Sequence, residues 1–483
     1  MLKLRKRPIR SGSATLHLQL PSTPAQRHLS APISRCQDSG LGDVKPILDL
    51  KSIRVDPTKH AENCKRKNYL LRVPSAEHVV RLHKKWRKHE DENVIARKKI
   101  KQIESEIPSS TDNKLLRNGL IAKASGIRDN LDEVSRTQDE LQERILKYAF
   151  DLPNFTSKET PIGKISEVIR QNDPPKQNYD RRQDHVKIGQ DLELIDFKAA
   201  SRTTGSGFYY LLNEAADLEH ALIQYALKVA RKAGYRHCSP PSLVHNHIGS
   251  ACGYQPRNVG ETREIYQLAD WIDLTGTAEI PFAGMEMGKV LRQEQLPQRL
   301  VGSSRCYRRE AGSHGTRDRG LYRVHEFSKV EMFAWTMPGQ ELEIFHQLVA
   351  IQEEIISSLN LPYRLIEVPS FDLGAPAYRK QDIEVFFPSR RSVDDGWGEV
   401  TSTSICTDYQ TRRLGTRLKL HNGKLDFPST LNGTAMAVPR MLAAVLEHGW
   451  QEHGVIVIPE VLRPFMDGRA AITRSNIESP ESE

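Results

Sequence analysis

Two heptad repeats near the N-terminus constrain the fold more than any other feature of this 483-residue chain. In 75–107 the seam positions recur at alternating spacings of three and four, at Val79, Leu82, Trp86, His89, Asn93, Ala96, Ile100, Ile103 and Ile107. The same spacing resumes at Ile127, Leu131, Val134, Gln138, Leu141, Ile145, Tyr148 and Leu152. The segment between them, PSSTDNKLLRNG, begins with a helix-stopping proline and is typical of a turn. The two repeats therefore predict an antiparallel coiled-coil hairpin.

The first helix of this hairpin is strongly basic. Its cations include Lys84, Lys85, Arg87, Lys88, Arg97, Lys98, Lys99 and Lys101. One interpretation is contact with a nucleic-acid phosphate backbone, and the other is a dimerisation coiled coil with a solvated charged face. The concentration of positive charge on one helix favours the phosphate contact.

The rest of the chain has the pattern of an α+β body. Segments rich in Pro, Asn and Lys at 152–163 and 171–182 indicate a linker. Short β-rich runs begin at Cys238, and the helices and strands follow in an irregular order, which favours an antiparallel sheet. Apolar periodicity predicts helices at 213–234, 339–359 and 437–449.

The composition narrows the class of partner. The formal net charge is +9 and the isoelectric point is about 9.1, which favours a polyanionic partner. No apolar run approaches the roughly 18 residues of a membrane-spanning helix, so no membrane partner is expected. The six cysteines form no C-x-x-C pair, which argues against a zinc knuckle.

The first 37 residues differ from the rest of the chain. They contain seven arginines and lysines together with many serines, and the first acidic residue is Asp38. An Arg-rich, Ser-rich segment without acidic residues is typical of an organelle transit peptide, mitochondrial rather than plastid. The alternative is a disordered basic tail that binds RNA.

The segment RCYRREAGSHGTRDRGLYRVHEF, residues 305–327, places six arginines between two expected strands. Arginine presents a planar fork that binds phosphate or carboxylate at two points, so a nucleotide phosphate is the expected ligand. Phe327 is available to stack on the base. Arg440, at the start of an apolar helix after a turn of small residues, is a second candidate for phosphate binding.

Several segments resemble the class II aminoacyl-tRNA synthetases in their seryl form. RRE, RGL and HEFSKVE within 308–331 resemble motif 2, GYRHCSPPSLV (234–244) looks like motif 1, and NGTAMAVPR (432–440) looks like motif 3. TGTAEIP (275–281) is similar to the Thr-Ala-Glu loop of the seryl enzymes, and the hairpin and DLKSIRVDP (49–57) are seryl features too. The motifs stand in the family order from about residue 46 to 466. Together with the N-terminus, they resemble a mitochondrial seryl-tRNA synthetase.

This resemblance implies a class II antiparallel β-sheet core flanked by helices, with an N-terminal coiled-coil hairpin arm. The expected organisation is a transit peptide (1–40, disordered), a tRNA-binding arm (46–155), a linker (156–200), a catalytic domain (201–466) and a polar tail (467–483). Class II enzymes pair through motif 1, so a homodimer is expected with Pro241 at the interface. Deletion of the arm, 76–150, is expected to spare serine activation and abolish tRNA charging.

The implied activity has two steps. L-serine and ATP form seryl-adenylate, and the seryl group then passes to the 3′ end of tRNA(Ser), here in the mitochondrial matrix. Neither step needs an enzyme nucleophile, so catalysis is positioning and charge stabilisation. A catalytically inactive synthetase-like RNA-binding protein is the alternative, although such a protein would be expected to lack some of the motif residues present here.

The resemblance also implies a role for each matching residue. Arg308, Arg440 and Glu399 are expected to be catalytic, and Glu399 with Ser402 to hold Mg²⁺. L-serine is expected at Thr277, Ala278, Glu279, Arg308, Glu331 and Thr434. ATP is expected at Arg308, Arg309, Glu310, Val324, Phe327, Glu399, Val400, Thr401, Ser402 and Arg440.

Some of these assignments have a plain structural alternative. Glu331, a lone acid in the apolar run VEMFAW, could form an ordinary core salt bridge. His314 and Arg317, at the tip of the arginine-rich loop, fit a solvated loop as well as contact with the tRNA acceptor end. Gly276 stands where the family commonly has proline, and HEF replaces a more usual HQF.

Overall fold

The computed structural model describes residues 44–108, 113–172, 184–254, 264–310, 320–451 and 454–473. The expected transit peptide, the loop-tip residues His314 and Arg317, most of the second linker segment and the tail beyond 473 lie outside these ranges. Within them, no helix is both long and apolar enough to cross a membrane.

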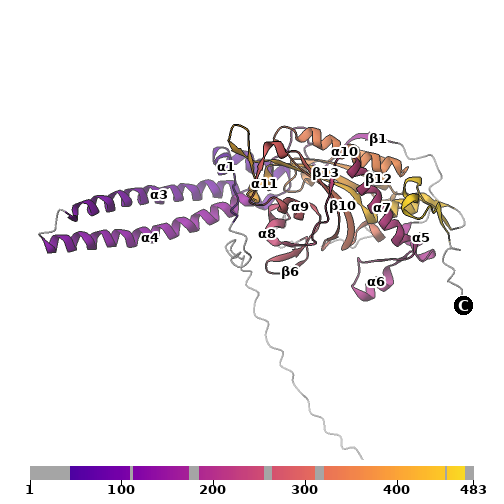
Figure 1. Cartoon of the computed structure of the whole chain (residues 1–483), viewed down its shortest axis with the longest axis horizontal. Helices are drawn as coiled ribbons and strands as arrows, with labels where there is room; N and C mark the ends of the chain where they lie inside the picture. The colour runs from indigo at the N-terminus through magenta and orange to yellow at the C-terminus, as the bar shows by residue number, and fades with distance from the viewer. Residues whose placement is uncertain are drawn as a thin grey trace, which may run out of the picture. The chain divides into compact units, whose positions relative to one another are not determined.

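The N-terminal helices form the expected hairpin. Two short helices, α1 (Leu50–Val55) and α2 (Pro57–Arg66), precede the long helices α3 (Ser75–Glu106) and α4 (Lys114–Phe150), which lie side by side (Figure 1). Every heptad position identified in the sequence is buried or half-buried, as the seam of a coiled coil requires.

Two polar seam positions of the hairpin, Asn93 and Gln138, are hydrogen-bonded to each other. Asn93 Nδ2 donates to Gln138 Oε1 over 2.8 Å, and Gln138 Nε2 donates to Glu90 over 2.7 Å. The connection between the helices is shorter than the expected turn, because α4 already begins at Lys114. Asn113 caps it by accepting from the Leu116 N–H over 3.0 Å, a helix-start signal inside the predicted turn.

An eight-stranded sheet forms the body, in the order β1-β11-β12-β13-β16-β10-β9-β4. Neighbouring strands are antiparallel except β4 and β9, so the expected antiparallel core is confirmed. The strands are β1 (Glu167–Gln171), β4 (Arg236–His237), β9 (Gln298–Tyr307), β10 (Glu326–Thr336), β11 (Tyr363–Glu367), β12 (Arg379–Phe386), β13 (Trp397–Thr407) and β16 (Ser429–Ala437).

Three long helices cover this sheet: α7 (Glu214–Lys232), α10 (Glu341–Ser358) and α12 (Val438–Gly449). They match the three helices predicted from periodicity to within two residues at each end. Their apolar faces share one buried core with alternate residues of the sheet, as Leu222, Phe345, Leu442 and Val330 illustrate. The opposite face of β10 carries Phe327, Lys329 and Glu331, followed by Phe333 and Trp335 in a second apolar cluster.

Smaller elements complete the body. The remaining helices are α5 (His185–Asp191), α6 (Phe197–Thr203), α8 (Asn246–Ala251), α9 (Glu279–Met285) and α11 (Tyr409–Arg413). The remaining strands are β2 (Ile195–Asp196), β3 (Tyr210–Leu211), β5 (Leu243–His245), β6 (Gln267–Ala269), β7 (Ile272–Leu274), β8 (Val290–Arg292), β14 (Arg417–Lys419), β15 (Leu425–Asp426), β17 (Trp450–Gln451), β18 (Val455–Val457) and β19 (Ala471–Thr473). The range expected to be a linker, 156–200, is partly structured, since β1 pairs with β11 and α5 packs on α12.

Candidate active site

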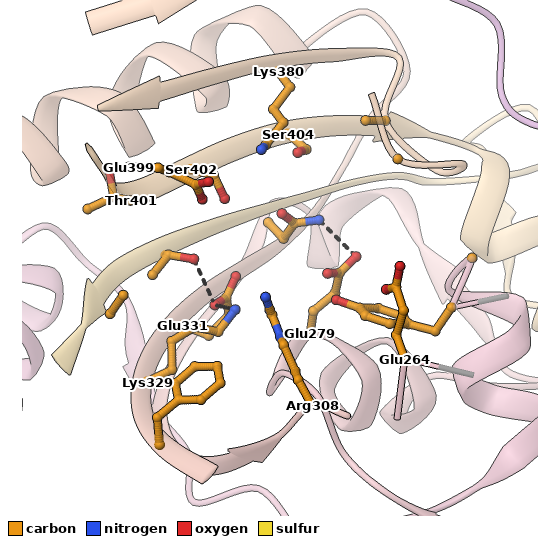
Figure 2. Close-up of a pocket in the computed structure, with 18 of the residues that line it drawn as sticks. Glu264, Glu279, Arg308, Lys329, Glu331, Lys380, Glu399, Thr401, Ser402 and Ser404 are labelled. Atoms are coloured by element: carbon orange, nitrogen blue, oxygen red, sulfur yellow. Dashed lines mark hydrogen bonds and ion pairs between the residues drawn. The ribbon is translucent and has the colours of Figure 1, made fainter. Parts of the chain in front are cut away.

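A polar cavity of about 420 Å³ opens beside β10, β12, β13 and β16. Figure 2 shows Glu399, Ser402 and Lys380 on one side of it and Glu331, Arg308 and Glu279 on the other. Twelve of the residues singled out in the sequence line this cavity: Glu279, Arg308, Glu310, Val324, Phe327, Glu331, Glu399, Val400, Thr401, Ser402, Thr434 and Arg440. Segments up to 161 residues apart, from Glu279 to Arg440, therefore meet at one site.

The strand β10 lines the cavity with alternate side chains. Phe327, Lys329 and Glu331 all face it, because residues two apart on a strand share a face. Lys329 Nζ lies 2.6 Å from Glu331 Oε2, and both side chains are less than a tenth exposed. Glu331 stands opposite Thr434 of β16, whose hydroxyl donates to it over 3.2 Å. Glu331 is thus in a buried ion pair and in the cavity wall at once.

Glu279 is the second buried acid of the cavity. It is 6% exposed, at the first position of α9, and its Oε1 accepts from Gln410 Nε2 over 2.6 Å and from Asn432 Nδ2 over 2.8 Å. Burial, helped by the negative charge of Glu331, raises the pKa of Glu279 to about 7. Two amides hold the carboxyl group in place, and its pKa lies close to neutral pH.

Arg308 follows β9 and crosses the cavity floor. Its Nε donates to the Gly276 carbonyl over 3.3 Å, and its guanidinium lies 5.4 Å from the centre of the Phe327 ring. The backbone N–H of Arg308 donates to the His325 carbonyl over 2.8 Å, which fixes the start of the arginine-rich loop. Glu310, two residues on, is ion-paired with Arg323 on the other side of that loop.

Arg440 enters the cavity from the first turn of α12. Its Nη1 donates to the Glu399 carbonyl over 2.7 Å and its Nε to the Tyr322 carbonyl over 3.0 Å. The guanidinium lies 4.5 Å from the centre of the Tyr322 ring. Two backbone carbonyls and one ring therefore set the direction of this cation.

A bulge in β13 brings oxygen donors together. Thr401 pairs with Ile383 and Glu399 with Glu384, so Val400 is the extra residue on β13. The bulge lets Glu399 and Ser402, three residues apart, both line the cavity. Burial opposes ionisation of Glu399, but Lys380, Arg440 and Arg308 outweigh it and lower the pKa of Glu399 below its usual range.

Four candidate residues do not line the cavity. Thr277 and Ala278 are fully buried behind Glu279, where the Thr277 hydroxyl accepts from the Glu279 N–H over 3.3 Å. The Arg309 guanidinium lies 5.9 Å from the centre of the Tyr266 ring. Pro241 is exposed just before β5. All four residues therefore lie outside the cavity lining.

Several lining residues escaped the sequence analysis. Lys329 and Asn432 lie within the quoted motifs, and the i, i+2 spacing of Lys329 and Glu331 could have indicated their shared face. Lys380 also lines the cavity and ion-pairs with Asp382 over 2.9 Å, while Gln410 of α11 reaches Glu279 from outside the lining; no local pattern points to either. Tyr69, from the base of the arm, also lines the cavity.

Two family profiles match the chain. The profile described as tRNA synthetase class II core domain (G, H, P, S and T) matches residues 267–449. The profile described as seryl-tRNA synthetase N-terminal domain matches residues 47–156. Together they cover the hairpin arm, most of the sheet and most of the cavity lining.

Individual proteins give the same result. The serine–tRNA ligase of Rhodopirellula baltica is 41% identical over 370 residues, covering 76% of this chain and 86% of that protein. The mitochondrial serine–tRNA ligase of Saccharomyces cerevisiae is 40% identical over 358 residues, covering 73% and 79%. The crystal structure of seryl-tRNA synthetase from Pyrococcus horikoshii complexed with ATP superposes with a TM-score of 0.81 at 31% identity, covering 88% and 99%.

Proposed function

The chain belongs to the seryl-tRNA synthetase family and is a serine–tRNA ligase, and we propose that it uses this cavity to charge tRNA(Ser) for mitochondrial translation. The observation that carries the assignment to the cavity is the convergence on it of twelve residues singled out in the sequence. Both the acids expected to bind serine and the cations expected to bind ATP phosphates are among them.

The serine end is proposed at Glu279, Glu331 and Thr434. The ammonium group of serine binds the Glu279 carboxylate, and the serine hydroxyl binds Glu331 and Thr434. Thr277 and Ala278 act through the backbone at the start of α9, which orients Glu279. A pocket that hydrogen-bonds a hydroxyl discriminates against alanine, because its buried polar groups would be left without partners.

The ATP end is proposed across Arg308, Phe327, Arg440 and Glu399. Adenine stacks on Phe327 beside Val324, with Glu310 at its edge, and Arg308 and Arg440 bind the phosphates through guanidinium forks. Val400, Thr401 and Ser402 line the opposite strand. Arg309 is not in the cavity lining and contributes to ATP binding from outside it.

The oxygen donors of Glu399 and Ser402 fit Mg²⁺. Glu399 is held anionic by the surrounding cations, and a carboxylate with a hydroxyl is the hard donor set that this ion takes. Among the described residues no group of three or more His, Cys, Asp or Glu side chains could hold a metal alone, so substrate phosphates would complete the coordination. When bound, Mg²⁺ would neutralise charge on the phosphates.

The chain's own residues supply positioning and charge. Arg308 orients the α-phosphate toward the serine carboxylate, which attacks it as pyrophosphate leaves. Arg308 and Arg440 then stabilise the charge that develops on the transferring phosphoryl oxygens. The 3′-terminal hydroxyl of tRNA subsequently takes the seryl group, and AMP is the leaving group.

The remaining assignments concern the partner and the compartment. The basic face of α3 contacts the backbone of tRNA(Ser), and a homodimer forms through the region of Pro241. The acid-free basic N-terminus, together with the yeast mitochondrial relative, supports import into the matrix. The test is charging of mitochondrial tRNA(Ser) with labelled serine, plus import of a reporter fused to residues 1–43 by isolated mitochondria. If charging were normal but the reporter were not imported, the ligase activity would stand and the mitochondrial location would be rejected.

A further inference from the structure

The base of the arm forms part of the cavity wall. Tyr69, between α2 and α3, lines the cavity together with residues 374–377 of the body, which we call the wall loop. The two are in one apolar cluster, which contains Tyr69 and Val79 from the arm and Ala375 and Tyr409 from the body. The arm is therefore joined directly to the active-site lining.

We call the contact between the arm base and the body the joint, and Lys67 stabilises it from the arm side. Its side chain is completely buried, and its Nζ donates to the carbonyls of Ala377 (2.8 Å), Asn154 (3.2 Å) and Ala375 (3.3 Å). A lysine ammonium has three N–H donors, so these three carbonyls match its full capacity. Two of the three carbonyls belong to the wall loop. A buried ammonium is costly unless its donors are used, so this geometry is tightly specified.

A second buried cation fastens the joint from the body side. Arg413, at the end of α11, donates to the carbonyls of Leu152 (2.9 Å) and Phe150 (3.1 Å) at the end of the arm. Asn154 adds a neutral contact, since its Nδ2 donates to the Pro376 carbonyl of the wall loop over 2.8 Å. Side chains of the arm base thus donate to backbone carbonyls of the body, and a side chain of the body donates to backbone carbonyls of the arm.

The wall loop and α11 stand beside Glu279. A Cβ on Gly253 would lie 2.6 Å from Cδ of Pro376, so the wall loop packs tightly against the segment that includes Cys252. Cys252 shares a buried apolar cluster with Ala278 and Ile280, which flank Glu279 in the chain. Burial, and secondarily the negative charge of Glu279, raises the pKa of the Cys252 thiol. From the other side, Gln410 of α11 donates to Glu279. A shift of the joint would therefore displace the groups around Glu279 before it displaced other parts of the cavity.

We propose that Lys67 is a positioning residue for serine binding: it fixes the wall loop through the carbonyls of Ala375 and Ala377 and so makes the base of the tRNA arm a working part of the serine pocket. This inference rests on the proposed placement of serine at Glu279. Lys67 is not among the residues that line the cavity, and it acts through the wall loop.

The test is ATP–pyrophosphate exchange without tRNA on the full chain carrying Lys67→Met, which keeps the length of the side chain and removes its donors. We expect KM for serine to rise about tenfold while KM for ATP changes less than about twofold. Lys65→Met is the matched control, because Lys65 lies two residues earlier with a side chain that is 58% exposed. The control should leave both constants unchanged.

Asn154→Ala keeps the proposal testable if Lys67→Met does not fold, as judged by circular dichroism. This smaller change loosens the same wall loop at Pro376 and should raise KM for serine selectively. An equal rise of both KM values, or no change in folded protein, would overturn the proposal. Absence of serine-dependent exchange by the unsubstituted chain would instead refute the proposed function.

Discussion

Lys329 Nζ and Glu331 Oε2 lie 2.6 Å apart on the cavity face of β10. From the sequence, Glu331 in its apolar strand could form a core salt bridge or bind substrate. Glu331 does have a core ion-pair partner, but the pair itself lines the cavity and faces Thr434 across the strand boundary. A structural role and a substrate-binding role are therefore compatible at this residue.

Glu331→Gln should lower kcat/KM for serine by about 100-fold, roughly 2.7 kcal/mol at 1.36 kcal/mol per tenfold. The change removes the charged acceptor for the serine hydroxyl and leaves Lys329 buried without its anion. Pyrophosphate exchange at varied serine measures it. Glu326→Gln is the control, on the same strand but with a side chain that is 37% exposed. Equal effects of the two changes would contradict the assignment.

Serine binding should depend on pH through Glu279. Its pKa is raised to about 7, mainly by burial, so the group is neutral below that pH and offers no charge to the serine ammonium. KM for serine should rise about fivefold between pH 7 and pH 6, because the ionised fraction of a group with a pKa of about 7 falls from about a half to about a tenth, and KM for ATP should not follow. A flat serine profile through this range would exclude Glu279 as the ammonium partner.

The raised pKa of Glu279 also makes the stability of the fold depend on pH. Because the folded pKa of Glu279 lies above the unfolded value, its contribution is fully present below the unfolded pKa of about 4.5 and is lost as pH rises through about 7. Substitution by Gln should remove this pH dependence from the free energy of unfolding, measured with denaturant at several pH values. An unchanged slope would argue against a raised pKa.

The arm can be shortened without touching the joint. Asn93 and Gln138 are hydrogen-bonded across the hairpin, so a short glycine linker can replace residues 94–137 and leave Val79, Leu82, Leu141 and Ile145 in their cluster. This variant should keep serine-dependent exchange and lose most tRNA charging. Undiminished charging would contradict the tRNA role of the arm.

The packing also revises the expectation for the larger deletion. Removal of 76–150 takes away arm residues that share a cluster with Ala375 of the wall loop. That deletion should therefore impair serine activation as well as charging, contrary to the sequence-based expectation. Comparison of the two deletions in one exchange assay separates the tip of the arm from its base.

Glu399→Gln should raise the Mg²⁺ concentration required for half-maximal exchange by about tenfold or more, because a neutral amide is a weaker ligand than a carboxylate. Titration of Mg²⁺ at saturating ATP and serine measures the shift. Glu384→Gln is the control, since Glu384 pairs with Glu399 in the sheet but does not line the cavity. An unchanged Mg²⁺ requirement would reject Glu399 as a ligand.

Periodicity and motifs predicted the parts of this molecule that local sequence controls. The heptads predicted the hairpin and placed Asn93 and Gln138 at its seam, and apolar spacing predicted the three long helices. The turn was predicted too long because Asn113 was not recognised as a helix cap. Most of the site was found because its residues stand in motifs of recognisable spacing.

The rest depends on tertiary packing. Gln410 and Lys380 belong to no motif: the packing of α11 brings Gln410 to Glu279, and the pairing of β12 with β13 brings Lys380 near Glu399. The bulge at Val400 places Glu399 and Ser402 on one face, and its cause lies in strand pairing rather than in local composition. Lys67 belongs to no motif, and only the fold shows that it is completely buried.

The most direct test of the account is ATP–pyrophosphate exchange by the chain without its first 37 residues, with serine, alanine and threonine offered separately. The account predicts exchange with serine and little with the other two, because only serine fills the hydroxyl site at Glu331 and Thr434 without excess bulk. A folded protein that exchanges with none of them, or equally with alanine, would contradict it.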